Sequence, residues 1–148
     1  MIGTDKLSRP LEVEITIPVR TYDIDFAGIV SNIVYIKWLE DLRLKFLDEH
    51  LPLETEIARG SVPIVSKTEI EYKRPIKLFE SVIGRLWIAN FGRIKYTIQA
   101  EIISNNNIAA TATQVGTFIR PVLKFASQCL QGFETNPCRL PFNVKTRV

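Results

Sequence analysis

Two aspartates, Asp23 and Asp25, stand shortly before an apolar segment with a helical pattern. Gly28 permits a turn between them and the helix, which we expect from about Asn32 to Asp48. This order places a carboxylate beside a helix N-terminus, where backbone N–H groups lack helical partners and the helix dipole is positive. A base or nucleophile beside such an oxyanion site is what acyl transfer requires.

Asp25 is the leading candidate for the reacting carboxylate, although an aspartate before a helix also caps it or stabilises a turn. Ser31 and Asn32 stand at the expected helix start and can cap it, which leaves Asp23 or Asp25 spare. The only histidine, His50, lies just past the expected helix end, where the dipole favours it. We therefore expect a carboxylate to carry the chemistry.

The composition is that of an ordinary globular domain. The chain has 148 residues, of which 46% are hydrophobic and 24% charged. The net charge of +3 is too small to indicate nucleic acid, and the basic residues alternate with acidic ones. No apolar run approaches the roughly 20 residues that span a membrane, and no secretory signal is apparent. We expect one cytoplasmic domain that binds neither nucleic acid nor membrane.

The sequence shows no pattern for a metal or a bound cofactor. Cys129 and Cys138 have no histidine nearby and fall short of the four ligands of a zinc site. A disulfide between them is unexpected in a reducing compartment. The sequence contains neither a GxGxxG motif nor a P-loop. We expect no metal and no cofactor.

The elements that must position Asp25 begin with a strand and the helix. Residues 11–19 alternate apolar and polar side chains, which is typical of a half-buried strand. The helix carries an apolar stripe that we expect to face the core. Its members are Val34, Tyr35, Trp38, Leu39, Leu42 and Phe46. Ile33, Ile36 and Leu47 widen this surface, so we expect the helix to be buried on more than one side.

Only strands are expected after the helix. We expect them over residues 64–73, 81–89, 93–102 and 108–119. The strand over 81–89 is more apolar on both faces, so we expect it to be central in the sheet. Turns are predicted at 90–92 and 104–107, where Gly and Asn tolerate positive φ. The last strand is rich in small residues, including Gly116. They would admit another backbone or a ligand, or pack tightly against the helix.

The order of elements predicts an α+β domain in which a five-stranded antiparallel sheet wraps around one long helix, because a sheet must cover its apolar face. The core would span about residues 11–120 of a single domain, 1–148. Apolar residues on the outer face, Ile83, Trp87 and Val115, suggest oligomer packing. Residues 121–148 lack periodicity, and we expect an extension that packs on the body or on a partner subunit.

The segment from Asp23 to Glu40 resembles the signature of the 4-hydroxybenzoyl-CoA thioesterase family of hotdog-fold acyl-CoA hydrolases. That family shows a D-x-D-x-x-G-x-V stretch leading into its central helix. The matching residues are Asp23, Asp25, Gly28 and Val30, followed by Tyr35 and Trp38. The resemblance covers roughly residues 11–120. Phe26 replaces the proline of the prototype, which alters the rigidity of the turn and keeps the carboxylate.

The resemblance implies a role for each motif residue. Asp25 would be catalytic, either as a nucleophile that forms a mixed anhydride or as a general base on water. The backbone N–H of Asn32 would polarise the thioester carbonyl. The remaining motif residues would shape the turn or line the acyl pocket: Gly28, Val30, Tyr35 and Trp38. Both aromatic residues also belong to the predicted core stripe.

The implied function is hydrolysis of an acyl-CoA by a homodimer or homotetramer, because the family's sites form between subunits. Coenzyme A would be part of the substrate, and five basic residues are available for its phosphates: Lys73, Arg74, Lys77, Arg93 and Lys95. The acyl group stays open between aromatic groups, such as 4-hydroxybenzoyl or 1,4-dihydroxy-2-naphthoyl, and short or medium fatty chains. The alternatives are a non-enzymatic acyl-CoA or acyl-carrier binding module and a hotdog hydratase, against which the missing loop histidine argues.

Overall fold

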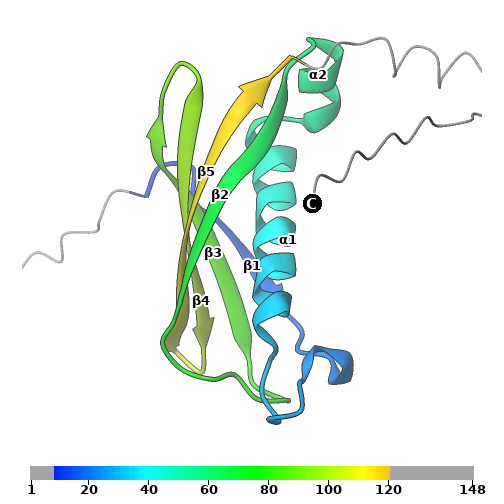
Figure 1. Ribbon diagram of the computed structural model, residues 1–148, viewed down its shortest axis with the longest axis vertical. Helices are drawn as coiled ribbons and strands as arrows, with labels where there is room; N and C mark the ends of the chain where they lie inside the picture. The colour runs from blue at the N-terminus through cyan, green and yellow to red at the C-terminus, as the bar shows by residue number, and fades with distance from the viewer. Residues whose placement is uncertain (1–8, 121–148) are drawn as a thin grey trace, which may run out of the picture.

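The computed structural model describes residues 9–120, which form a five-stranded antiparallel sheet curled around one long helix (Figure 1). The elements in order are β1 (Val13–Ile17), the 3-10 turn η1 (Thr21–Asp23), α1 (Asn32–His50), α2 (Leu53–Ala58), β2 (Val62–Tyr72), β3 (Val82–Phe91), β4 (Lys95–Ser104) and β5 (Asn107–Ile119). The strands are ordered β1-β3-β4-β5-β2 across the sheet. The predicted fold class is confirmed. The predicted extension and both cysteines lie outside the described residues.

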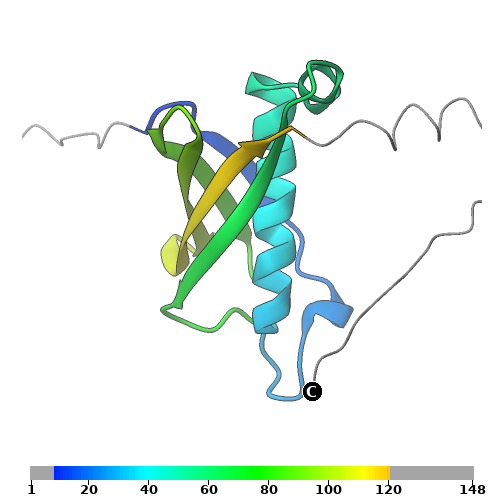
Figure 2. The same cartoon turned by 45° about the horizontal axis from the view of Figure 1, so that its top comes forward.

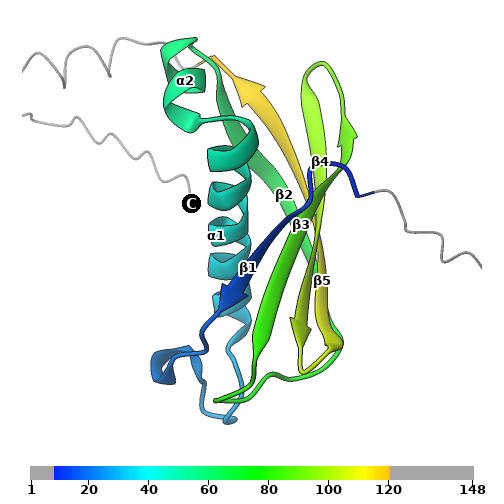
Figure 3. The ribbon, with the colours of Figure 1, turned by 180° about the vertical axis from the view of Figure 1, so that it is seen from behind.

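The long helix α1 packs chiefly on β1 and β3, on the concave side of the sheet (Figures 2 and 3). The predicted stripe is buried from Val34 to Leu42, and Phe46 is partly buried. Ile33 and Ile36, in contrast, are 69% and 47% exposed. The prediction that the helix is buried on more than one side is therefore wrong for the single chain, because the sheet covers only one face of α1.

A glycine in β3 lets α1 approach the sheet closely. A Cβ atom at Gly84 would lie 2.9 Å from Cδ1 of Leu42 and 3.0 Å from Cδ1 of Ile17. Leu42 is fully buried at this point. The missing side chain in the sheet is thus what allows the helix to pack deeply against it.

The two hairpin turns agree with the sequence to different degrees. Asn105 and Asn106 form the turn between β4 and β5 with φ of 48° and 62°, as predicted. The turn between β3 and β4 lies at 92–94, two residues later than predicted, so Ile94 stands in the turn and is 65% exposed. At a bulge between Ile88 and Asn90 the pairing of the two strands shifts by one residue, and β3 continues to Phe91.

An additional helix and the start of the first strand also differ from the prediction. The short helix α2 follows α1, where only strands were expected, and Pro52 precedes its first residue. Strand β1 begins at Val13, because Leu11 adopts a φ of 56° that a strand does not allow.

Within residues 9–120, no helix is long and apolar enough to cross a membrane.

Gly116 in β5 makes room for a side chain from the neighbouring strand. Tyr96 of β4 is its direct pairing partner, and the Tyr96 hydroxyl donates a hydrogen bond to the Ile64 carbonyl on β2 at 3.1 Å. The Tyr96 ring therefore crosses β5 over the glycine and connects three strands. The Tyr96 ring occupies the space above Gly116, which accounts for the small residue at this position. The predicted alternatives, a ligand or close packing of the helix, are not needed here.

Replacing this glycine should destabilise the fold. A methyl group in Gly116→Ala would overlap the Tyr96 ring and come within 2.6 Å of the Ile64 carbonyl oxygen. Urea titration should show a free energy of unfolding lower by about 1–3 kcal/mol, the usual cost of overpacking. Thr113→Ala, on the same strand, is a control with an expected change within about 0.5 kcal/mol. Equal urea midpoints for the two variants would mean that Tyr96 does not need this space.

Candidate active site

The segment between η1 and α1 folds back on itself as a narrow loop at one end of the molecule (Figure 1). Ile24 and Val30 form an isolated antiparallel bridge, and the Asp25 N–H donates to the Ile29 carbonyl at 2.9 Å. Gly28 adopts a φ of 76° and donates its N–H to the Asp25 carbonyl at 3.0 Å. The predicted role of Gly28 in the turn follows from this positive φ, which side chains disfavour.

Asp23 has a structural role in this loop. Asp23 is only 6% exposed, and its Oδ2 accepts a hydrogen bond from the Arg20 N–H at 2.8 Å. The Asp23 carbonyl accepts another from the Ser31 N–H at 2.9 Å. Asp23 thus joins η1 to the start of α1, and it is not the spare carboxylate.

Asp25 is half-buried and uses only one of its carboxylate oxygens within the loop. Its Oδ1 accepts a hydrogen bond from the Ala27 N–H at 2.8 Å, so this residue does stabilise the turn. Its Oδ2 takes part in no hydrogen bond or ion pair with any of residues 9–120. One oxygen therefore orients the carboxylate, and the other is available to a substrate.

The N-terminus of α1 is open. Ser31 occupies the N-cap position, yet its side chain makes no capping hydrogen bond. The expectation that Ser31 or Asn32 caps the helix through its side chain is therefore wrong. Within the described part of the chain, the backbone N–H of Asn32 donates to no acceptor. The sequence-predicted donor is thus free at the positive end of a 19-residue helix.

Tyr72, at the end of β2, is a residue of this site that the sequence did not reveal as functional. Its hydroxyl donates to the Asn32 carbonyl at 3.3 Å, and its ring meets that of Tyr35 edge-on at a centroid distance of 5.1 Å. This contact connects the edge strand β2 to the first turn of α1. The only local signal was an aromatic residue just before the Arg74-Pro75 strand end.

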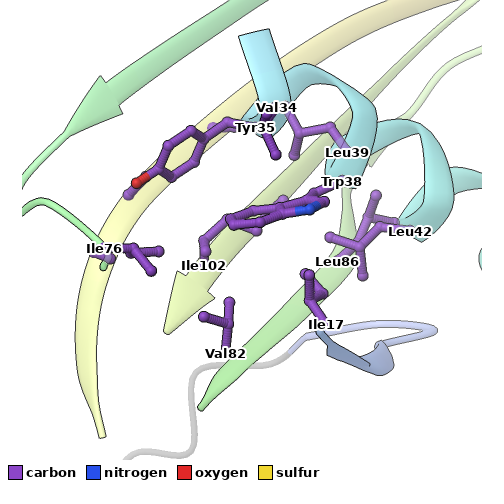
Figure 4. Close-up of a cluster of buried hydrophobic side chains, with 14 of the residues drawn as sticks. Ile17, Val34, Tyr35, Trp38, Leu39, Leu42, Ile76, Val82, Leu86 and Ile102 are labelled. Carbon is purple, nitrogen blue, oxygen red and sulfur yellow. The ribbon is translucent and has the colours of Figure 1, made fainter. Parts of the chain in front are cut away.

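Tyr35 and Trp38 lie in the core beneath this end of α1, with ring centroids 5.2 Å apart (Figure 4). Trp38 is 5% exposed, and its indole lies between the helix and the sheet. Tyr35 is 3% exposed, and burial raises its pKa to about 12, with Tyr72 and Glu80 adding to the rise. The phenol therefore stays protonated at neutral pH. Within residues 9–120 its hydroxyl has no hydrogen-bond partner, so it can donate to a ligand.

A second loop, between β2 and β3, lies against the first. The carbonyl oxygen of the buried Ile76 accepts a hydrogen bond from the Val30 N–H at 2.8 Å. Val30, 2% exposed, thereby fixes the loop just before α1. Arg74 on the second loop pairs with Glu80 at 3.3 Å. Val30 thus holds the two loops together through a backbone hydrogen bond and a buried side chain.

The five basic residues considered for coenzyme A phosphates separate into two groups. The loop after β2 carries three of them: Lys73, Arg74 and Lys77. Arg93 and Lys95 belong to the β3–β4 hairpin, and Arg93 shares a surface pocket with Leu51, beyond the other end of α1. Only the first group lies at the end of the molecule that holds Asp25.

His50 is the last residue of α1, which ends two residues later than expected, and its ring packs on Phe46. The 19 residues of α1 extend about 28 Å at 1.5 Å per residue, so His50 lies far from the helix N-terminus. In the described part of the chain, no group of three or more His, Cys, Asp or Glu residues gathers as metal ligands do. The candidate site consists of a carboxylate, backbone donors and tyrosines.

Apolar side chains are exposed around this site. Phe26 in the first loop is fully exposed, and Phe79 in the second loop is 92% exposed. Phe79 also adopts a φ of 70°, which is unusual for a bulky residue. Together with Ile33 on α1, they place apolar surface in water on three neighbouring segments. Surface of this kind is typical of a contact with a ligand or another chain.

Comparison with known proteins relates this fold and site to thioesterases. The family model of the Thioesterase-like superfamily matches residues 19–123. No curated protein matches the chain. Similar solved structures include a thioesterase complexed with coenzyme A and Zn from Thermus thermophilus, with 24% identity over 73% of this chain and 79% of that chain and a TM-score of 0.66.

Two further structures are similar to the same extent. A DHNA-CoA thioesterase from Staphylococcus aureus has 21% identity over 76% of this chain and 75% of that chain, with a TM-score of 0.67. A 1,4-dihydroxy-2-naphthoyl-CoA thioesterase from Synechocystis has 19% identity over 74% of this chain and 83% of that chain, with a TM-score of 0.67. At these identities the structures share the hotdog fold with this chain. Because the family model covers more than half of its length, the chain belongs to the thioesterase-like superfamily.

Proposed function

We propose that this protein hydrolyses an acyl-CoA thioester to the free acid and coenzyme A. Asp25 is the catalytic carboxylate, and the backbone N–H of Asn32 is the donor to the thioester carbonyl. The observation that carries the proposal is the pairing of an unused carboxylate oxygen on Asp25 with an uncapped helix N-terminus in the same loop. Membership in the thioesterase-like superfamily supports it.

The chemistry follows from where charge develops. A thioester carbonyl oxygen gains negative charge as its carbon becomes tetrahedral, so a donor at the helix N-terminus stabilises the transition state more than the ground state. Asp25 either attacks the carbonyl carbon and forms a mixed anhydride, or removes a proton from the attacking water. In both routes the bond to sulfur breaks and the coenzyme A thiolate leaves. In the first route water then hydrolyses the mixed anhydride, which gives the free acid and restores Asp25. The three basic residues of the loop after β2 are our candidates for its phosphates.

For the acyl group we favour an aromatic ring over a short or medium fatty chain. Tyr35 supports this choice, because its protonated hydroxyl lacks a partner within residues 9–120 and can donate to a hydroxyl on the ring. The similar structures from Staphylococcus aureus and Synechocystis are described as a DHNA-CoA thioesterase and a 1,4-dihydroxy-2-naphthoyl-CoA thioesterase. Thiol release from a panel of acyl-CoAs, followed with a thiol-reactive dye, would rank aromatic against aliphatic substrates.

Asp25→Asn is expected to abolish hydrolysis in a folded protein. The amide oxygen can still accept the hydrogen bond of the Ala27 N–H, so the turn is kept while the base or nucleophile is lost. Loss of such a group typically costs about 10²–10⁴ in rate. Release of thiol from the best acyl-CoA of the panel measures the effect.

Asp23→Asn is the matched control. It keeps an acceptor for the Arg20 N–H and should hydrolyse at nearly the original rate. Full turnover by Asp25→Asn would refute the assignment of this residue. Thermal stabilisation of the unsubstituted protein by acyl-CoAs without any release of thiol would refute hydrolysis and indicate a binding module.

Asn32→Pro is expected to remove the proposed oxyanion donor while keeping the helix. Asn32 is the first helical residue, where proline is well tolerated, and Ser31 before it already has φ of −62° and ψ of 142°, as a residue before proline prefers. The kcat should fall by about 10²–10³, the usual cost of one such donor. Circular dichroism checks that the helix is retained.

Asn32→Ala separates the backbone donor from the side chain. It removes the same side chain and keeps the N–H, so its kcat should stay close to that of the original protein. If the proline and alanine variants turn over equally, the N–H of Asn32 does not contact the reacting carbonyl.

We also propose that the working form is a homodimer or homotetramer. Ile33, Phe26 and Phe79 expose apolar surface at the site, and β2 is an 11-residue edge strand of the sheet. Light scattering should give a mass of two or four times 16.9 kDa. A species with the mass of one chain that retains full turnover would rule out a site shared between subunits.

A further inference from the structure

An apolar pocket lies at the end of α1 opposite to Asp25. Its walls come from the C-terminal half of α1, from α2, and from the ends of the strands β2 to β5. The cavity has a volume of about 180 Å³. Native interiors leave few voids larger than a water, whose share of liquid volume is about 30 Å³, and an apolar cavity of about 150 Å³ admits a benzene ring. The pocket therefore has room for apolar side chains.

The walls of this pocket are mostly apolar and therefore favour an apolar occupant. Leu44, Ile57 and Phe91 are 44%, 41% and 63% exposed, which is apolar surface left in water. Of the described residues that line it, only Glu40 and Arg43 are charged, and they form an ion pair with each other. No lining cation is left to attract a carboxylate or a phosphate. Apolar side chains thus fit the pocket better than a fatty acid or a coenzyme A ester.

The described chain ends beside the pocket. Phe118 of β5 lines it, and Ile119, the last residue of β5, pairs with Val62, another lining residue. After Arg120 the sequence continues for residues 121–148 and begins Pro-Val-Leu-Lys-Phe-Ala. Five residues of chain can extend by at most about 17 Å. Residues 122–126 can therefore reach the pocket directly from the end of β5.

We propose that residues 122–126 of the same chain pack into this pocket, with Leu123 and Phe125 as the inserted side chains. The segment then completes the core at the C-terminal end of α1. Its own chain is favoured over a second copy because a short tether keeps the segment at an effective concentration of the order of millimolar. This inference is independent of the proposed thioester hydrolysis.

A spin label on Cys129 tests the proposal in the full-length protein. The Cys138→Ser variant leaves Cys129 as the single thiol for a nitroxide. Backbone amide signals of residues 44–51 and 57 should lose intensity in NMR spectra, and those of residues 25–33 should keep it. The variant that also carries Leu123→Asp and Phe125→Asp has the same tether without the apolar side chains. In this variant the backbone amide signals of residues 44–51 should regain their intensity.

A matched variant and a mixed sample complete the test. Phe133→Asp lies outside the proposed segment and should leave the attenuation unchanged. Equal attenuation with and without the two aspartates would overturn the proposal, because the tether alone would then explain it. Attenuation in a mixture of spin-labelled chains and unlabelled, isotope-enriched chains would also overturn it, since a second copy would then supply the segment.

Discussion

Burial of one apolar stripe of α1 against the curved sheet is the interaction on which the other features depend. Leu39 and Leu42 are at most 1% exposed, and Gly84 lets the helix pack closely over β3. Each fully buried side chain of this size contributes about 1.5–3 kcal/mol. In proteins most of the stability of a helix comes from the packing of its apolar face rather than from helix propensity. The same packing fixes where the two ends of α1 lie.

At the N-terminal end, the polar groups of two loops are arranged around the first turn of α1. Val30 and Ser31 donate their N–H groups to carbonyls of Ile76 and Asp23, and the Tyr72 hydroxyl reaches the Asn32 carbonyl. The Asn32 N–H is left without an acceptor in the described part of the chain. A missing side-chain cap typically costs about 1 kcal/mol. Such a local cost is expected where a helix end serves a ligand.

Local patterns predicted the regular elements well and their irregular joints poorly. The helical stripe and the Asn105–Asn106 turn follow from side-chain period and from the tolerance of Asn for positive φ. The position of the β3–β4 turn does not, because side-chain alternation gives no sign of the bulge between Ile88 and Asn90 or of where β3 ends. The exposure of Ile33 was also missed, since periodicity indicates an apolar face without indicating what covers it.

The sequence by itself determined that a carboxylate precedes a long helix, that Gly28 turns the chain between them, and that one helix must cover one sheet. Only the tertiary structure decided that Asp23 is tied into the loop, that Ser31 leaves the helix uncapped, and that Tyr72 meets Asn32. Side-chain period and turn propensity are properties of neighbouring residues, so they can be predicted from the sequence. The choice between the two aspartates rests on hydrogen-bond geometry, and the tyrosine contact joins residues 40 positions apart. Neither the hydrogen-bond geometry nor the tyrosine contact can be predicted from side-chain periodicity.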